Sequence, residues 1–351
     1  MAARRAQAGA GAAPGRGPRL AGLIRGRAAA GTASLFSHGA HPLARTLDYP
    51  GDPGLFGPGS MTWPVAGDTA VFVGGIRALL VQAAHPEVAA GVAQHSRYRQ
   101  DPLGRLTRTA AYVTATSFGA MPEVSRAVTI VRARHRHVAG HSDRGLPYHA
   151  SDPALAAWVH NTLTDSFLTA YRAYGARPCP PPGADRYVRE QTRVGELLGA
   201  APLPDTAAAL SAWVASHPRL APSPACAQAI AFLRRPPLPP AILPAYHVLL
   251  RAAVATLPGR IQQITGLRSR PGDLTAGRAA VTTLRWALGS SPDWQLALAR
   301  TGATPTPQAR FRQPPPTTTS PGKTPGQPCP HASPREVPPM ARPAADTSHS
   351  P

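Results

Sequence analysis

Three histidines lie within seven residues of one arginine-rich segment, VRARHRHVAGH, residues 131–141. Imidazole rings at close spacing bind Zn²⁺ or haem iron, so their relative positions decide which chemistry is available. The apolar positions of residues 122–140 follow steps of four and three, at Val124, Val128, Val131 and Val138. His135 falls on this apolar stripe of a helix, whereas His137 points about 200° away among arginines. His141 lies beyond Gly140, where we expect the helix to end.

The three histidines therefore do not form a cluster. A two-histidine zinc face needs the spacing i, i+4 and a nearby carboxylate, and the chain contains neither HExxH nor its inverse. Of the three histidines, only His135 has two possible interpretations. It is either a core histidine that is hydrogen-bonded to a neighbour, or a neutral imidazole that faces an apolar pocket as a proximal haem ligand does.

A polar stripe precedes the histidines, at positions that share one face of a helix: Arg105, Thr109, Tyr112 and Thr116. The stripe is either a solvated face or the wall of a pocket. In a pocket, Arg105 would pair with a propionate or another anion, and Thr109 would donate a hydrogen bond. His160 stands on the next long helical segment, beside Leu163 and Thr164. His85 ends an earlier segment and is interpreted as a helix cap.

Helices must position these side chains, because the apolar pattern from 68 to 300 is helical throughout and no alternating strand pattern occurs. We expect an all-α fold. Caps and stops delimit its clearest helices, which span 68–85, 87–96, 101–119, 122–140 and 153–175. Weaker helical patterns cover 184–199, 205–215, 223–234, 240–257 and 274–289.

Composition divides the 351 residues into three parts. Residues 1–46 hold seven arginines and no acid, and 301–351 are rich in Pro and Thr, so we expect both segments to be disordered. Residues 47–300 are the expected folded domain. The cysteines Cys179, Cys226 and Cys329 are far apart, which excludes a disulfide framework or a CxxC metal site.

The formal net charge is +20, yet Lys323 is the only lysine beside 36 arginines. A chain-wide preference for arginine explains this charge as well as selection for nucleic acid does, and no stacking aromatics accompany it, so we expect no specific nucleic-acid binding. The LAGLI patch is too short for a secretion signal, and no apolar run is long enough to span a membrane. The expected location is cytoplasmic, with peripheral membrane contact through the basic N-terminal arm.

The chain contains GDPGLFGPGSMTWPVAGDTAVFVGGIRALLVQAAHPEVAAGVAQHSRYRQDPLGRLTRTAAYV, then VRARHRHVAG, then DPALAAWVHNTLTDSFLTAYRAYG. These segments resemble the DUF2236 family, the catalytic domain of rubber oxygenase (latex clearing protein) and of the ER-bound oxygenase of mycophenolic acid biosynthesis. The resemblance covers about 48–300. It implies a helical, globin-like fold that binds haem b, with an Arg-x-x-x-Thr pair and a proximal histidine.

By this resemblance Arg105 and Thr109 are the Arg-x-x-x-Thr pair and the catalytic residues, which would fix the haem and polarise bound oxygen. His135 would be the iron ligand, and His160 a neighbour of the haem with a weaker match. Arg108 stands where rubber oxygenase has a lysine beside the matched threonine, and a guanidinium is a poor iron ligand. The resemblance implies a haem-dependent oxygenase that uses O2 or peroxide on an apolar, unsaturated or terpenoid-like molecule. Because no secretion signal is expected, rubber is not the expected substrate. The alternative is a non-catalytic helical protein that binds haem or another lipophile.

Overall fold

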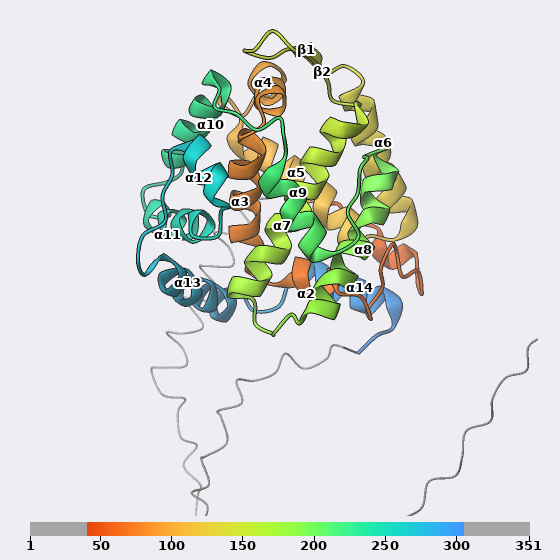
Figure 1. The fold of residues 1–351 in the computed structure, drawn as a ribbon. Coiled ribbons are helices and arrows are strands. Elements are labelled where there is room, and N and C mark those ends of the chain that lie inside the picture. Colours follow the sequence, from red (N-terminus) through yellow and green to blue (C-terminus); the bar gives the residue numbers. More distant parts are fainter. Residues whose placement is uncertain (1–40, 305–351) are drawn as a thin grey trace, which may run out of the picture. The chain divides into compact units, whose positions relative to one another are not determined.

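The computed structural model describes residues 41–304, and within them the chain is helical apart from one short β-hairpin, which confirms the all-α class (Figure 1). A 3₁₀ turn, η1 (Thr46–Asp48), comes first. The first six helices are α2 (Thr62–Gly67), α3 (Val71–Ala83), α4 (Pro86–His95), α5 (Pro102–Phe118), α6 (Met121–His135) and α7 (Pro153–Tyr174). Then follow α8 (Pro181–Leu197), α9 (Ala207–Ser216), α10 (Pro224–Arg234), α11 (Leu243–Val254), α12 (Gly259–Thr265), α13 (Asp273–Leu288) and α14 (Pro292–Thr301).

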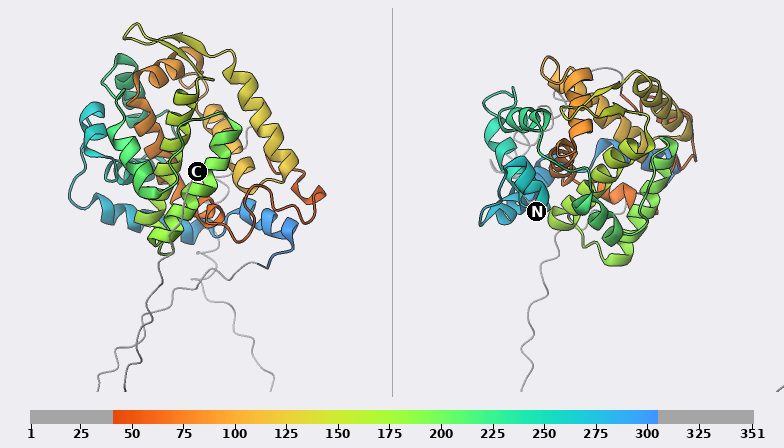
Figure 2. Two further views of the ribbon diagram at one scale, coloured as in Figure 1. Left: turned by 45° about the vertical axis from the view of Figure 1, so that its right-hand side comes forward. Right: turned by 45° about the horizontal axis from the view of Figure 1, so that its top comes forward.

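Helix α7 forms the centre of this body and packs against α3, α8, α9 and α13 (Figure 1). Its apolar positions meet those of the surrounding helices in one large core, in which Trp158, Val73 and Leu80 are fully buried. Helices α10 to α12 lie on one side of α7, and α5 and α6 lie on the other (Figure 2). A smaller apolar cluster joins α5 and α6 to α8.

The local signals for α5 and α7 are confirmed in detail. The Asp101 carboxylate accepts a hydrogen bond from Gly104 N, and the Asp152 carboxylate accepts from Ala154 N and Leu155 N, so each acid caps its helix. Asp68 bonds Ala70 N in the same way and also pairs with Arg285. These hydrogen bonds are local in sequence and could be predicted from it, whereas the Asp68–Arg285 ion pair joins residues 217 positions apart and could not.

The end of α6 differs from the expectation. The helix ends at His135 and not at Gly140, because the chain turns at 136–137 and enters an antiparallel hairpin of β1 (Ala139–His141) and β2 (Pro147–His149). Gly140 pairs with Tyr148, and a Cβ at 140 would lie 2.7 Å from the Tyr148 hydroxyl. Gly140 thus serves close packing of the hairpin and does not terminate a helix.

Both ends of the described chain pack on the same body. Leu43 and Thr46 are buried, and Arg300 of α14 donates hydrogen bonds to Thr46 Oγ1, Asp52 O and Phe118 O. The boundaries expected at 46/47 and 300/301 therefore fall inside this packed region. The rest of the expected arm and tail, residues 1–40 and 305–351, lies outside the described residues. Within 41–304, no helix combines the length and hydropathy needed to cross a membrane.

Candidate functional site

The start of the polar stripe on α5 and the histidine of α6 lie at the same end of a two-helix hairpin. Only residues 119–120 separate α5 from α6, and the two helices pack against each other. The start of α5 follows α4 after residues 96–101, and the end of α6 leads into β1, which α4 also contacts. Since α4 holds both ends, Arg105 in the first turn of α5 and His135 at the end of α6 lie at the same end of the hairpin.

Arg105 is half-buried in this region. Burial lowers the pKa of its guanidinium and the neighbouring Arg108 lowers it further, while Tyr98 opposes the shift. The guanidinium nevertheless stays charged. Among the described residues it has no carboxylate partner and no side-chain hydrogen bond. A desolvated cation without a counter-ion is a suitable partner for an anionic group of a ligand.

His135 lies on the face of α6 that also carries the buried Val124 and Val128. The ring is half-buried, and burial lowers its pKa, so the imidazole is neutral at physiological pH and offers a nitrogen lone pair. His137 is exposed in the turn after the helix, and His141 is exposed in β1. The three histidines occupy separate environments, as their spacing predicts, and no group of three metal-ligating side chains occurs in residues 41–304.

Thr109 is exposed, and its hydroxyl donates a hydrogen bond to Arg105 O at 3.1 Å. This position differs from the expected hydrogen-bond donor inside a pocket, because the side chain of Thr109 faces outward. Solvent exposure of the stripe decreases from Thr109 towards the C-terminal end of α5. Thr116 is buried, and the Tyr112 hydroxyl is completely removed from solvent.

His160 is buried at a cavity formed by α2, α5, α7 and α8. Burial lowers the pKa of His160 to about 4, and a hydrogen bond with the Gln191 backbone opposes the shift only in part. The Thr164 hydroxyl lies 3.4 Å from His160 Nε2. A side chain at Gly195 would meet the His160 ring at 2.9 Å, so the glycine lets α8 approach it.

The structure thus brings His160 together with Tyr112 and Thr116 at this inner cavity. Arg105, Thr109 and His135 do not line it and belong to the outer end of the hairpin. The cavity offers about 20 Å³ to the centre of a water-sized sphere, enough for about one water molecule. A porphyrin requires several hundred cubic ångströms and does not fit there. His160 lines this cavity, and its expected place beside a haem stays a prediction.

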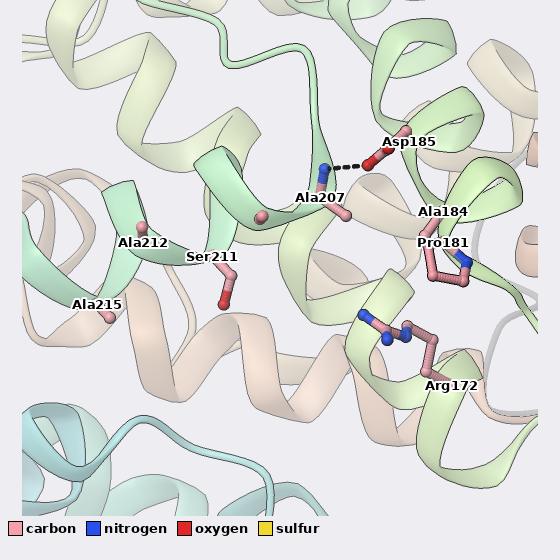
Figure 3. A pocket seen from close by; sticks show the side chains of 9 residues that line it. Arg172, Pro181, Ala184, Asp185, Ala207, Ser211, Ala212 and Ala215 are labelled. Atoms are coloured by element: carbon pink, nitrogen blue, oxygen red, sulfur yellow. Dashed lines mark hydrogen bonds between the residues drawn. The ribbon is translucent and has the colours of Figure 1, made fainter.

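A larger surface groove of about 580 Å³ lies between α7, α8 and α9 (Figure 3). Alanines form most of its wall, and Arg172 and Asp185 are its charged residues. The Asp185 carboxylate accepts a hydrogen bond from Ala207 N, which is at the start of α9. None of the expected site residues lines this groove. Its Asp185 carboxylate has a structural role, because it binds the start of α9.

A second polar cluster, at the start of α4, was not predicted from the sequence. The Glu87 carboxylate is fully buried, bound by the Ser142 hydroxyl and by two arginines, Arg144 and Arg219. His85, interpreted as a cap, is instead buried with Nδ1 3.3 Å from Glu87 Oε2. Burial lowers the pKa of His85 to about 4. The signal was weak, because the partners lie more than 50 residues apart in sequence.

The geometry can be compared with known proteins. Residues 63–286 match the family model described as ER-bound oxygenase mpaB/B′/Rubber oxygenase, catalytic domain. The chain belongs to this family. No curated protein and no solved structure matches the chain significantly.

The match to the mpaB/rubber oxygenase family runs from α2 into α13 and includes the outer and inner parts of the candidate site. The segment before Trp63 and helix α14 lie outside the matched range. The resemblance that the sequence indicated is therefore confirmed at the level of the family and of its helical fold.

Two side chains at the outer end of the hairpin have the chemistry that a haem would need. An unpaired, desolvated guanidinium at Arg105 suits a propionate, and the neutral His135 ring on the adjoining helix suits iron.

Proposed function

We propose that the protein is a haem-b-dependent oxygenase that acts on an apolar, unsaturated or terpenoid-like small molecule, with O2 or peroxide as the oxidant. Membership of the oxygenase family rests on the match over residues 63–286. The haem rests on one observation, the position of the unpaired Arg105 guanidinium at the same end of the α5–α6 hairpin as the neutral His135 ring.

In this proposal His135 binds the iron and Arg105 binds a haem propionate. When bound, the haem supplies the oxygen chemistry that amino-acid side chains lack. Arg105 neutralises the propionate charge, and half-burial strengthens this ion pair because less water competes for it. His135 keeps a free lone pair, because burial disfavours its protonated form.

Thr109 adds a polar contact at the rim, one helical turn after Arg105. Its hydroxyl oxygen can accept a hydrogen bond while the hydroxyl continues to donate to Arg105 O. Apolar side chains of α6 and α8, namely Val124, Val128 and Val194, cluster below this rim and keep water away from the deeper part of the hairpin.

An absorption spectrum tests the cofactor. The full chain, purified from haem-supplemented cells, is expected to show a Soret band with about one haem per chain. Addition of O2 or hydrogen peroxide and an apolar alkene should then yield an oxygenated product. A Soret band without product would favour the non-catalytic binding protein, and a folded chain that takes up no haem would refute the proposal. Membrane contact through the N-terminal arm stays a prediction about residues outside 41–304.

A further inference from the structure

The inner cavity contains one hydroxyl that the fold does not use. The Tyr112 hydroxyl is inaccessible to solvent and has no hydrogen-bond partner among residues 41–304. Its aromatic ring packs with the apolar cluster of Val124, Val128 and Val194, which fixes the side chain in place. Burial raises the pKa of Tyr112, so the phenol keeps its proton. A buried, unsatisfied hydroxyl is rare in folded proteins and calls for a partner.

Three of the other hydroxyls that line the cavity are already engaged. Thr116 donates to Tyr112 O at 2.9 Å, Thr164 donates to His160 O at 3.0 Å, and Thr62 donates to Glu190 Oε2 at 2.9 Å. Thr116 and Thr164 bind backbone carbonyls of their own helices, and Thr62 binds the carboxylate of Glu190. None of these groups offers its hydrogen to Tyr112.

His160 supplies the second unused position. Burial keeps the ring neutral, and the nearby Gln191 backbone opposes this lowering of the pKa only in part. A neutral imidazole carries one N–H, so its other nitrogen is an acceptor. The Thr164 hydroxyl approaches Nε2 only at 3.4 Å, a weak contact for a hydroxyl whose hydrogen is already donated to a carbonyl.

Tyr112 and His160 line the same cavity, and its volume of about 20 Å³ accommodates one water molecule. We propose that the cavity is a binding site for a single water molecule, which accepts a hydrogen bond from the Tyr112 hydroxyl and donates one to the His160 ring. The water satisfies both groups at once and joins α5 to α7. This site does not depend on the haem or on the oxygenase reaction.

The bridging water also determines which ligand groups can enter the inner cavity. Displacing the water with a hydrocarbon group would leave two buried polar groups without partners, which is unfavourable. An apolar ligand at the outer end is therefore excluded from this cavity. That consequence rests on the proposed function, whereas the water site itself does not.

A crystal structure of the full chain, at a resolution that shows ordered water, tests the site directly. We expect one water within hydrogen-bond distance of Tyr112 Oη and of a His160 ring nitrogen, and its loss or displacement in Tyr112→Phe. A cavity without water, or a direct hydrogen bond from Tyr112 Oη to another protein group, would overturn the proposal.

Thermal unfolding of the haem-free chain supplies an independent measurement. Tyr112→Phe removes a satisfied hydroxyl if the water is present, so its melting temperature should fall by about 1–4 °C. If the cavity were dry, the substitution would remove an unsatisfied hydroxyl, and the melting temperature would stay or rise. Tyr246→Phe is the matched control, because the Tyr246 hydroxyl donates directly to Leu233 O at 2.6 Å. Its melting temperature should fall in either case.

Discussion

Arg77 of α3 and Asp165 of α7 form an ion pair in the centre of the molecule, with Nη1 2.7 Å from Oδ2 and both side chains buried. The same guanidinium donates to the Ser166 hydroxyl and to Thr256 O, so the pair links α3 and α7 to the segment after α11. Buried charges are tolerated only when every partner is in place.

Asp165→Asn should therefore destabilise the protein strongly, because it leaves the Arg77 charge buried without a counter-ion. The expected loss in the free energy of unfolding is about 3–5 kcal/mol. Urea denaturation monitored by circular dichroism measures it. Arg45→Gln is the control, since Arg45 and Asp48 form an exposed pair and its loss should have no measurable effect. Equal midpoints for the two variants would contradict this account.

His135→Ala should remove the haem while the helical circular dichroism persists. In the proposed site His135 is the only iron ligand, so the purified variant is expected to be nearly colourless. His137→Ala is the matched control, because His137 is exposed in the following turn. Absorbance at the Soret maximum per mole of protein decides the outcome. A folded His135→Ala variant with a full and unshifted band would remove His135 from the site.

Arg105→Ala should weaken haem retention more than Arg108→Ala does. A hydrogen bond to a charged group contributes roughly 1.5–3 kcal/mol, so transfer of haem to apomyoglobin should become about tenfold to a hundredfold more favourable. Arg108 forms only an exposed ion pair with Asp101 at 3.2 Å, and its loss should have little effect. The same transfer constant for both variants would show that the Arg-x-x-x-Thr pair has been matched in the wrong register.

Acid should destabilise the protein partly through His160. Its pKa is about 4 in the folded chain, below the usual 6.5, so the unfolded chain binds the proton more tightly. The contribution of His160 to the free energy of unfolding is fully present above about pH 6.5 and falls as the pH decreases towards 4. At pH 5 the loss from this residue is about 2 kcal/mol relative to neutral pH.

The difference in unfolding free energy between pH 7.5 and pH 5 measures this contribution. His160→Gln lacks the titrating ring and should show a smaller difference than the wild type. Both proteins keep His85, whose pKa is also about 4, so its contribution cancels in the comparison. An identical pH dependence in the two proteins would show that His160 is protonated in the folded state as readily as in the unfolded state.

Local signals predicted most helices of the fold. Asp101 and Asp152 stand before prolines and cap α5 and α7, and the steps of four and three place Val124 and Val128 in the core. The β-hairpin could not be predicted in this way. Its strands have three residues each, and its position depends on α4, which is distant in sequence. The same tertiary contacts end α6 at His135, although the apolar stripe continues to Val138.

The site shows the same division. The periodicity of α5 places Arg105, Thr109 and Tyr112 on one face, but it contains no information about how exposure changes along that face. The structure supplies it, with Thr109 exposed and the Tyr112 hydroxyl buried. His160 reaches its cavity because Gly195 lets α8 approach, a fact that depends on packing between helices.

The hairpin after α6 connects His135 to α4 and to the polar cluster around Glu87. Gln94 Nε2 donates to His141 O at 2.9 Å, His95 Nε2 lies 2.9 Å from Ala139 O, and the buried Glu87 binds Ser142 and Arg144. Helix α4 thus fixes the strand that begins four residues after His135. Sequence changes around Glu87 can therefore adjust the position of the proposed iron ligand at a distance, which gives natural variation a way to tune the cofactor without replacing any residue that contacts it.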